Sequence, residues 1–320
     1  MILVTGASGY VGSNLVRRLV ETGQPVRALV HNRAKAEARL TDLLDGIEIA
    51  AGDVTRPETL APALDGVTAV IHLVAVAIEH GDLTYERVNF QGTANVVEAA
   101  KAAGVRRLIH MGQNGSDSAL PYPFLASKGK AQDVVAASGL DWTVLRPSVI
   151  WGPQDEFANV QARLIKLTPL IFPIVGDGQA RFQPVWVGDV AEAAVRCLDD
   201  DRTIGQVYAL GGPEVLTYAE IVGRVLKALG ARRLTLNVPV PLLRPVVKLI
   251  EIALPNPPVT TSLLSLLKVD NTTPDNALPT VFDITPRPFV PENLAYMRQF
   301  SALGSLKRLM GQRTADEVRL

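Results

Sequence analysis

Val4-Thr5-Gly6-Ala7-Ser8-Gly9-Tyr10-Val11-Gly12, close to the start of the chain, carries three glycines at three-residue spacing. The glycines follow a short β-branched run, Ile2–Thr5, and precede Tyr10–Glu21, in which apolar residues recur at helical spacing. This order predicts a strand, a tight glycine turn and an amphipathic helix in direct succession.

Each glycine has a separate task in a turn of this kind. The first permits the tight turn, the second lets the backbone approach a pyrophosphate without a Cβ in the way, and the third lets the helix pack closely on the strand. The helix then offers unpaired N–H groups and the positive end of its dipole to the phosphates. We therefore expect a dinucleotide to contact Gly6, Ser8, Gly9, Tyr10, Val11 and Gly12. The alternative is a structural glycine turn without a ligand.

Strand and helix patterns alternate over the first 150 residues. The expected strands are Ile2–Thr5, Val26–Val30, Ile47–Ala51, Val67–Val74, Arg107–Met111 and Trp142–Leu145. The expected helices are Tyr10–Glu21, Tyr85–Ala103 and a segment from about Phe124 to Ser138. Such alternation predicts an α/β fold, a Rossmann-type doubly wound parallel sheet covered by helices on both faces.

Proline interrupts this pattern after Pro147, and the chain then becomes rich in loops. Val187–Leu198 is expected to form a further helix, and Gln206–Leu210 a strand that rejoins the first sheet. We expect residues 1–150 with 183–212 to form the nucleotide-binding Rossmann domain. Residues 151–182 with 213–320 would form a smaller, mostly helical C-terminal portion that contacts substrate, acts as a lid or binds a partner.

Composition excludes several other classes of protein. The 320 residues include 32 Lys and Arg and 32 Asp and Glu, and a chain without net charge is a poor candidate for binding nucleic acid. Cys197 is the single cysteine, so an intramolecular disulfide and a multi-cysteine metal site are both excluded. The four histidines have no zinc-site spacing, and we expect no metal.

Two features bear on location. No signal-peptide pattern opens the sequence, and the longest apolar run, Val67–Ile78, is shorter than the about 20 residues of a membrane-spanning helix, so we expect a cytoplasmic protein. Ile221–Ile250, however, holds six basic residues and no acid among many apolar ones. Such a segment suits peripheral attachment to an anionic membrane surface. The alternative is a helix that packs over the cleft with basic outer residues.

The glycine pattern and several later motifs resemble the short-chain dehydrogenase/reductase superfamily, in its extended and atypical branches, which include epimerases and dehydratases. The similar motifs are Gly52-Asp53-Val54, Ile71-His72-Leu73-Val74-Ala75, Val88-Asn89-Phe90-Gln91-Gly92-Thr93 and Leu145-Arg146-Pro147-Ser148-Val149. The segment Gly176–Val190 and Ile284-Thr285-Pro286-Arg287-Pro288 resemble one subgroup, which is similar to the nucleotide-binding accessory subunit of mitochondrial complex I.

The resemblance implies cofactor contacts beyond the glycine turn. Asp53 and Val54 would meet the adenine ring, and Lys128 would remain a cofactor ligand unless it is a solvated helix residue. The same resemblance places further contacts at Leu73, Val74, Ala75, Met111, Pro147 and Val149.

The end of the second strand bears on the choice of dinucleotide. Folds specific for NAD place an acid there to bind the ribose 2′-OH, but here the strand continues Val30-His31-Asn32-Arg33. Arg33 can pair with a 2′-phosphate through its planar guanidinium, and His31 can assist. We therefore expect NADP to be preferred, with NAD the alternative if Arg33 only begins the next helix as a solvated residue.

The catalytic pair of the family is missing. Ordinary members carry Tyr-x-x-x-Lys on one helix face, so that the lysine lowers the tyrosine pKa for proton exchange with the substrate. Here Phe124 stands four residues before Lys128, and Gly112-Gln113 stands where relatives carry Ser-Ser. Tyr122 and Gln113 are the remaining candidates for a catalytic role, and Tyr122 lies roughly 240° around the helix from Lys128.

Three functions follow from these observations. The first is an NADP(H)-binding protein in which the nucleotide has a structural or sensing role, within a respiratory or membrane-linked assembly. The second is an NADP-dependent oxidoreductase, epimerase or dehydratase that uses an unusual proton donor. The third is a subunit scaffold that has lost its cofactor. The sequence names no substrate and gives no oligomeric state.

Overall fold

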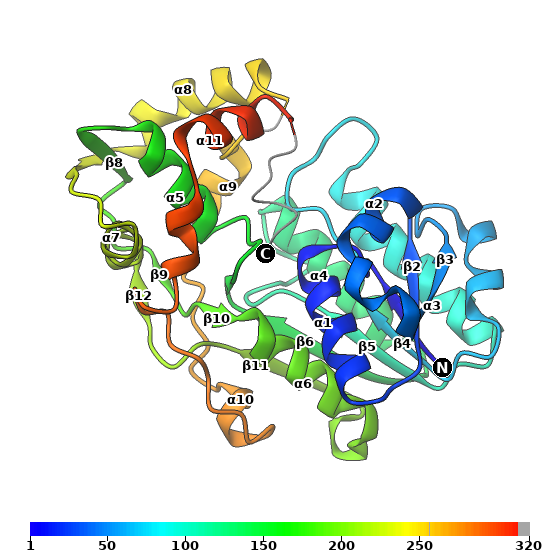
Figure 1. Cartoon of the computed structure of the whole chain (residues 1–320). Coiled ribbons are helices and arrows are strands. Elements are labelled where there is room, and N and C mark those ends of the chain that lie inside the picture. Colours follow the sequence, from blue (N-terminus) through cyan, green and yellow to red (C-terminus); the bar gives the residue numbers. More distant parts are fainter. Residues whose placement is uncertain (256, 313–320) are drawn as a thin grey trace. The chain divides into compact units, whose positions relative to one another are not determined.

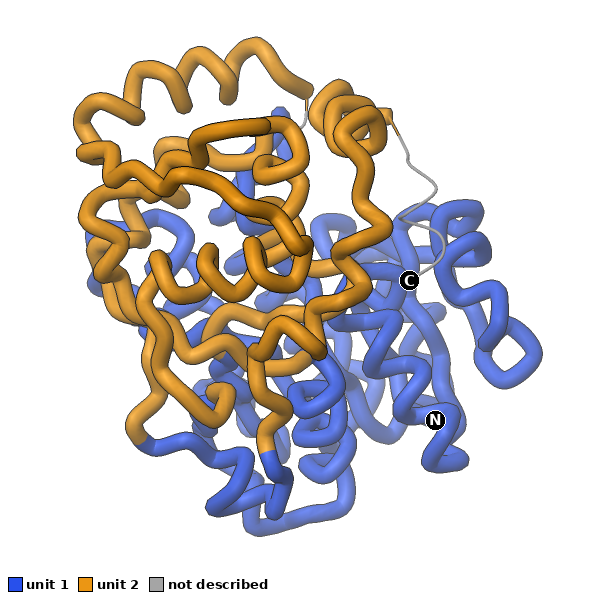
Figure 2. The backbone as a smooth tube through the Cα atoms, turned by 60° about the vertical axis from the view of Figure 1, so that its left-hand side comes forward, with its two compact units in different colours: residues 1–147, 187–210, 275–285 blue, residues 148–186, 211–274, 286–320 orange. Residues whose placement is uncertain are grey.

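The computed structural model describes residues 1–255 and 257–312 of the chain. The chain divides into two compact units, coloured separately in Figure 2. Unit 1 comprises residues 1–147, 187–210 and 275–285, and unit 2 comprises residues 148–186, 211–274 and 286–320. Within the described residues, no helix combines the length and the apolar character that crossing a bilayer requires.

Unit 1 is built on a sheet of seven strands, all parallel, in the order β11-β6-β5-β4-β1-β2-β3. Six of the strands have buried β-branched or aliphatic residues on one or both faces, as parallel strands covered by helices require. The bounds are β1 (Ile2–Thr5), β2 (Val26–Val30), β3 (Ile47–Ala51), β4 (Ala69–His72), β5 (Arg107–Met111), β6 (Asp141–Pro147) and β11 (Gln206–Leu210). The predicted Rossmann-type sheet is confirmed.

Helices cover both faces of this sheet (Figure 1). On one face α1 (Tyr10–Glu21) packs beside α6 (Val187–Asp199), where Arg18 Nε donates to Glu192 Oε2 at 2.6 Å. On the other face α3 (Gly92–Ala102) and α4 (Pro123–Ala136) bury their apolar sides against β4, β5 and β6. The shorter helices are α2 (Arg33–Arg39), η1 (Thr41–Gly46), η2 (Pro57–Thr59), η3 (Ala61–Leu64), η5 (Asp201–Thr203) and α10 (Ala277–Thr280).

The strand order reverses direction between β1 and β4. β1 pairs with β2 on one side and with β4 on the other, so the loops after β1 and β4 leave the sheet toward opposite faces. In open α/β sheets, ligands bind in the crevice outside the carboxyl ends of the strands at such a switch point. The glycine turn after Thr5 and the segment after His72 lie there.

The expected helix over Tyr85–Ala103 is present, but it is not a single α-helix. Tyr85–Gln91 forms a π-helix, η4, and the α-helix α3 begins only at Gly92. A Cβ on Gly92 would lie 2.9 Å from Val54 Cγ2, so glycine allows the helix to approach the β3 end of the sheet closely. The expected strand Val67–Val74 is likewise shorter in the structure, since pairing covers only Ala69–His72.

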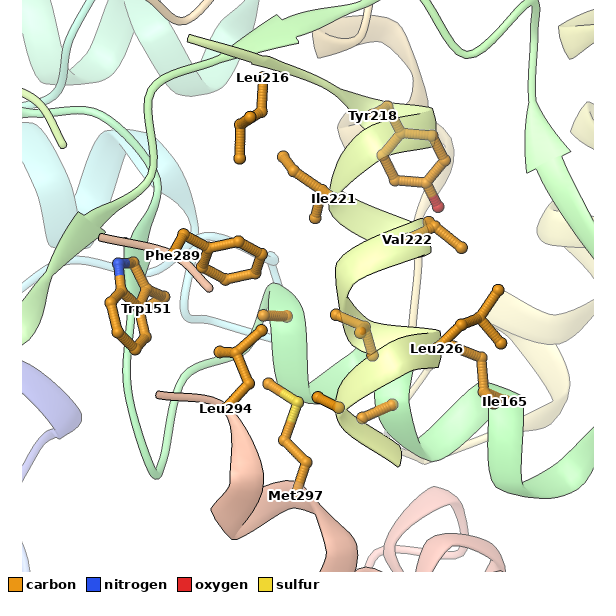
Figure 3. Close-up of a cluster of buried hydrophobic side chains, with 14 of the residues drawn as sticks. Trp151, Ile165, Leu216, Tyr218, Ile221, Val222, Leu226, Phe289, Leu294 and Met297 are labelled. Atoms are coloured by element: carbon orange, nitrogen blue, oxygen red, sulfur yellow. The ribbon is translucent and has the colours of Figure 1, made fainter. Parts of the chain in front are cut away.

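Unit 2 has a separate apolar core, formed around α7 (Tyr218–Leu229) (Figure 3). A capping box between Thr217 and Glu220 starts α7, and Gly230 in the left-handed conformation, at φ +62°, ends it. Phe289 lies edge-on against Trp151, with ring centroids 5.4 Å apart. The other core helices are α5 (Ala158–Leu167) and η6 (Ala295–Gln299).

Short two-stranded sheets and outer helices complete unit 2. The strand pairs are β7 (Ile150–Trp151) with β10 (Val185–Trp186), β9 (Arg181–Phe182) with β12 (Leu216–Thr217), and β8 (Ile171–Val175) with β13 (Leu234–Val238). The outer helices are α8 (Val240–Ala253), α9 (Thr261–Leu266) and α11 (Ala302–Leu309).

The unit boundaries differ from the expected domain boundaries at residues 148–150, 183–186, 211–212 and 275–285. Residues 275–285 belong to unit 1, because Arg196 donates to the carbonyl of Phe282 and the ring of Tyr208 packs against Phe282. Residues 183–186 and 211–212 belong to unit 2, because Gln183 Nε2 donates to Gly212 O at 2.9 Å. The proline content of the sequence could not predict the contacts of Phe282 or the hydrogen bond between Gln183 and Gly212.

Candidate dinucleotide-binding site

The glycine turn has the geometry that close approach of a phosphate requires. Gly6 has φ +73°, a conformation that favours glycine. A Cβ on Gly12 would lie 2.1 Å from the carbonyl oxygen of Gly6, so only glycine lets α1 pack on the turn. A Cβ on Gly9 would lie 3.0 Å from the same oxygen, and the amide of Gly9 already donates to it at 2.9 Å.

The N-terminus of α1 carries no side chain that competes with an anion. Gly9 is the N-cap residue, no side chain caps the first turn, and no acid lies in that turn. The first backbone N–H groups of a helix need partners, and the positive end of the helix dipole favours a negative one. This cradle fits the pyrophosphate of a dinucleotide. Ser8, Tyr10 and Val11 are half-buried around it.

Asp53 and Val54 follow β3 and have different environments. The Asp53 carboxylate accepts hydrogen bonds from the backbone N and the hydroxyl of Thr55, both at 2.8 Å. Desolvation raises the pKa of Asp53, but the hydrogen bonds from Thr55 and the nearby His31 outweigh it, and the net pKa lies below the ordinary value. Val54 is buried in the core beneath α3, and its carbonyl accepts from Asn95 Nδ2 at 2.8 Å.

His31 and Arg33 lie just beyond β2 and are both solvent-exposed. Asn32 caps α2 by accepting from Lys35 N at 2.9 Å, which makes Arg33 the first residue of that helix. The Arg33 guanidinium pairs with Glu37 at 2.8 Å, and His31 Nε2 lies 3.6 Å from Asp53 Oδ2. A 2′-phosphate at this position would therefore compete with Glu37 for Arg33.

A buried hydrogen-bond network joins β1, β4 and α3. Thr5 Oγ1 accepts from Leu73 N at 3.3 Å, so its hydrogen is free to point at His72 Nδ1, 2.7 Å away. Thr93 Oγ1 donates to Asn89 O at 2.7 Å, so it accepts from His72 Nε2 at 3.0 Å. These partners assign His72 the neutral tautomer with the proton on Nε2. Burial lowers the pKa of His72 to about 3.

Asn89 fixes the chain that follows β4. Its Oδ1 accepts from Val76 N at 2.8 Å, and its Nδ2 donates to Val76 O and to Ser127 Oγ, both at 3.1 Å. Asn89 is fully buried, so it acts as a bidentate clamp between the segment after β4, the π-helix η4 and helix α4. Leu73 and Val74 are half-buried in the clamped segment, and Ala75 is exposed.

Lys128 lies deep in unit 1, with a relative exposure of 3%. Its Nζ donates to the carbonyl oxygen of Met111, at the end of β5, at 2.6 Å. Desolvation lowers the pKa of Lys128 to about 8. A solvated helix lysine is therefore the wrong description of this residue.

His110 lies beside His72, with stacked rings whose centroids are 5.4 Å apart. It is fully buried, and neither ring nitrogen has a hydrogen-bond partner within residues 1–255 and 257–312. Burial, the charge of Lys128 and the neighbouring His72 all lower its pKa, so the ring is neutral.

Phe124, four residues before Lys128, lies on the first turn of α4. Its ring packs edge-on against Tyr85, with centroids 5.7 Å apart, and Tyr85 donates its hydroxyl hydrogen to Ala77 O at 2.9 Å. Tyr122 is the N-cap residue of α4, and Pro123 is the first helical residue. The structure thus places Tyr122 outside the regular helix that carries Lys128.

The loop after β5 is held tightly against α4. A Cβ on Gly129 would lie 2.2 Å from the backbone N of Ser118, so this approach requires glycine. Gln113 is half-buried and its carbonyl accepts from Ser116 N at 3.1 Å. The Ser116 hydroxyl is buried without a hydrogen-bond partner in the described part of the chain.

The remaining predicted cofactor ligands fall in both units. Pro147 ends β6 in unit 1, and its carbonyl accepts from Asn114 N at 3.0 Å. Val149 belongs to unit 2, where its carbonyl accepts from Val185 N at 3.0 Å. Among the described residues, no group of three or more His, Cys, Asp or Glu side chains is arranged to hold a metal ion.

Sequence reasoning missed the polar network of Thr5, His72, Thr93 and Asn89. The sequence motifs contain these residues, but a histidine at the end of an apolar strand does not reveal its hydrogen-bond partners. The pairing of β1 with β4 places Thr5 directly opposite His72, and this register is what connects them. The alternation of side chains along each strand could have suggested the contact.

Similarity to known proteins agrees with this site. A family model described as NAD(P)H-binding matches residues 6–201. The chain is 31% identical to the NAD(P)H azoreductase of Xenophilus azovorans, over 72% of this chain and 74% of that protein. It is 29% identical to the mitochondrial NADH dehydrogenase (ubiquinone) 1 alpha subcomplex subunit 9 of Arabidopsis thaliana, over 68% of this chain. The chain spans only 55% of the length of that subunit.

A solved structure shows the same fold. The UDP-glucose 4-epimerase of Thermus thermophilus in complex with NAD superposes with a TM-score of 0.62 and 25% identity, over 74% of this chain and 86% of that chain. The chain belongs to the NAD(P)H-binding family. The predicted resemblance to atypical short-chain dehydrogenases/reductases, including the relatives in complex I, is confirmed.

Proposed function

We propose that this protein binds NADP(H) in the glycine turn of unit 1 and holds it in a structural or sensing role. A bound nicotinamide supplies hydride-transfer chemistry, whereas the residues of this chain orient and retain the nucleotide. The observation that carries the proposal is the pair Phe124 and Lys128. The buried lysine of the family is retained beside β5, but the residue four positions before it has no proton to give.

The proposed preference for NADP rests on the end of β2. No acid stands at positions 31–33 to bind a ribose 2′-OH and repel a 2′-phosphate. The Arg33 guanidinium is exposed and can turn from Glu37 to a 2′-phosphate, which offers more charge and more acceptor oxygens. His31 would add a second donor.

An enzymatic function is the second candidate, and two observations favour it. The relative from Xenophilus azovorans is named as a reductase, and Tyr122 carries a hydroxyl at the N-cap of α4. In this alternative Tyr122 or Gln113 would hydrogen-bond the substrate during hydride transfer. The third candidate, a scaffold without nucleotide, is disfavoured by the intact cradle, in which each glycine still occupies a position that a Cβ would obstruct.

We also propose a location and a class of partner. The relatives in mitochondrial NADH dehydrogenase support association with a respiratory assembly. Together with the basic, apolar region of unit 2, they support a cytoplasmic protein attached peripherally to a membrane.

Calorimetric titration of the purified chain with NADPH and with NADH tests the binding proposal. NADPH is expected to bind at one site per chain and more tightly than NADH. Absence of binding by both nucleotides would leave the scaffold function as the better account, and a clear preference for NADH would refute the argument from Arg33.

A further inference from the structure

Helix α8 exposes most of its apolar side chains. Of its 14 residues only Val247 is buried. Leu242, Val246, Leu249 and Ile252 are 66%, 54%, 68% and 73% exposed. At 100° per residue these four side chains occupy one side of the helix, nearly opposite Val247. We call these four residues the α8 stripe.

The apolar residues of α7, earlier in the basic region, do not contribute to such a surface. Ile221, Val222, Val225 and Leu226 of α7 are buried in the core of unit 2. Arg224 of the same helix pairs with Glu214 and with the carbonyl of Phe289. The expectation that Ile221–Ile250 forms one surface segment is therefore wrong for α7, whereas Leu234 and Leu236 of β13 and most apolar side chains of α8 are exposed.

Cations border the α8 stripe. Arg244 and Lys248 lie between the α8 stripe and the buried side of the helix. Cations at these positions would meet the lipid headgroups if the α8 stripe were inserted in a bilayer. Together with Lys268 they line a surface pocket of about 660 Å³ that also includes Val240, Pro241 and Thr261. No carboxylate lines this pocket. The acid on α8 is Glu251, which accepts from Thr261 Oγ1 at 3.1 Å and lies 3.9 Å from Lys248.

A second helix of unit 2, α11, also exposes apolar side chains. Leu303, Leu306 and Met310, in α11 and at its C-cap, are exposed at helical spacing. A Cβ on Gly311, just after α11, would lie 3.5 Å from Pro255, just after α8, so the C-terminal ends of the two helices meet. Both helices lie on the outer side of unit 2 (Figure 1).

We propose that α8 lies in the surface of an anionic lipid bilayer, with the α8 stripe inserted among the acyl chains and Arg244, Lys248 and Lys268 in contact with lipid phosphates. A helix of 14 residues is about 21 Å long, too short to span a bilayer but suited to lying in its surface. The cations and the acid-free pocket complement a bilayer of anionic lipid. This inference specifies the peripheral attachment proposed above and does not depend on the nucleotide.

The single buried cysteine of the chain permits a direct test. Leu249→Cys can be labelled with an environment-sensitive fluorophore, because Cys197 is fully buried. The full chain is then mixed with vesicles of phosphatidylcholine alone or with phosphatidylglycerol added. A blue shift of the label is expected only with the anionic vesicles. Leu83→Cys, at an exposed leucine of unit 1, is the matched control and is expected to show no shift.

Two variants separate insertion from charge attraction. Leu242→Ser with Leu249→Ser is expected to weaken co-sedimentation with anionic vesicles by about tenfold. Arg244→Glu with Lys248→Glu is expected to abolish it, and high salt to weaken binding of the wild type. Lys101→Glu in unit 1 is the charge control and should leave binding unchanged.

Three results would overturn the proposal. The first is no fluorescence shift of the Leu249→Cys label on anionic vesicles. The second is vesicle binding by the serine variant that equals binding by the wild type. The third is a wild-type chain that self-associates and binds no vesicles, while the serine variant is a monomer. The last result would mean that a second copy covers the α8 stripe. NADPH titration of the same variants keeps this test separate from the proposed function, because nucleotide affinity is expected to stay unchanged in all of them.

Discussion

Lys128 Nζ lies 2.6 Å from the carbonyl oxygen of Met111, and this buried hydrogen bond joins α4 to the end of β5. The ammonium is held where desolvation lowers its pKa to about 8. Burial of a charged group destabilises a fold unless the charge is paired and hydrogen-bonded. The residue that would use it in relatives is Phe124 here, so in our account the lysine serves nucleotide binding alone.

Replacing Lys128 by Met is expected to stabilise the nucleotide-free protein and to weaken NADPH binding. The folded-state pKa of about 8 lies below the ordinary lysine value of 10.5, so the free energy of unfolding declines as pH falls from 10.5 and the loss is complete below 8. At pH 7 the free energy of unfolding of the variant should rise by about 1–3 kcal/mol. The contribution of the lost hydrogen bond to Met111 reduces this gain. Urea unfolding across this pH range measures the effect. An unchanged pH dependence in Lys128→Met would contradict it.

Gly9→Ala is expected to remove nucleotide binding and to leave the fold intact. The added Cβ would lie 3.0 Å from the Gly6 carbonyl oxygen, in the space that a phosphate needs. Gly46→Ala is the matched control, because its Cβ would meet only Val20 at 3.4 Å. Calorimetry with NADPH and thermal unfolding measure the two properties. Tight NADPH binding by Gly9→Ala would show that the phosphates lie elsewhere.

Acid should destabilise unit 1 through His72. The folded-state pKa of about 3 lies below the ordinary histidine value of 6.5, so the neutral ring contributes stability that is present above pH 6.5 and lost as pH falls toward 3. In His72→Asn this decline of the unfolding free energy at acid pH should disappear. At neutral pH the variant should be about 1–3 kcal/mol less stable, because the hydrogen bonds to Thr5 and Thr93 are lost. Unfolding free energies measured at several pH values test this. The same decline of the unfolding free energy at acid pH in both proteins would contradict the prediction.

Arg33→Ala should weaken NADPH binding by about tenfold or more and leave NADH binding nearly unchanged, because only NADPH carries the 2′-phosphate. Glu37→Gln should strengthen NADPH binding slightly, since it removes the residue that pairs with Arg33. The ratio of the two dissociation constants is the quantity to compare. Equal losses for both nucleotides in Arg33→Ala would point to a general structural role instead.

Much of unit 1 could be predicted because its signals are local. The β-branched runs gave the bounds of β1, β2, β3, β5 and β11 correctly, and the glycine spacing predicted the tight turn between β1 and α1. Phe124 was identified from its spacing to Lys128 alone. Gly23, Gly104 and Gly139, which all have positive φ, follow closely after the ends of α1, α3 and α4.

The parts that failed depend on contacts between distant segments. The pairing of β8 with β13 joins residues about 60 positions apart, and neither strand shows a strong pattern of its own. The π-helix at Tyr85–Gln91 depends on the close approach of Gly92 to Val54. The buried state of Lys128 depends on the fold around it, since lysines are rarely buried and its sequence neighbours are ordinary helix residues.

The central claim is that the chain holds NADPH without turning it over, and one measurement tests it most directly. Purified protein is loaded with NADPH, dialysed, and followed by nicotinamide absorbance in the presence of a panel of carbonyl and quinone acceptors. We expect the nucleotide to remain bound and to oxidise no faster than free NADPH. Sustained oxidation that Tyr122→Phe abolishes would contradict the claim and establish the chain as an enzyme.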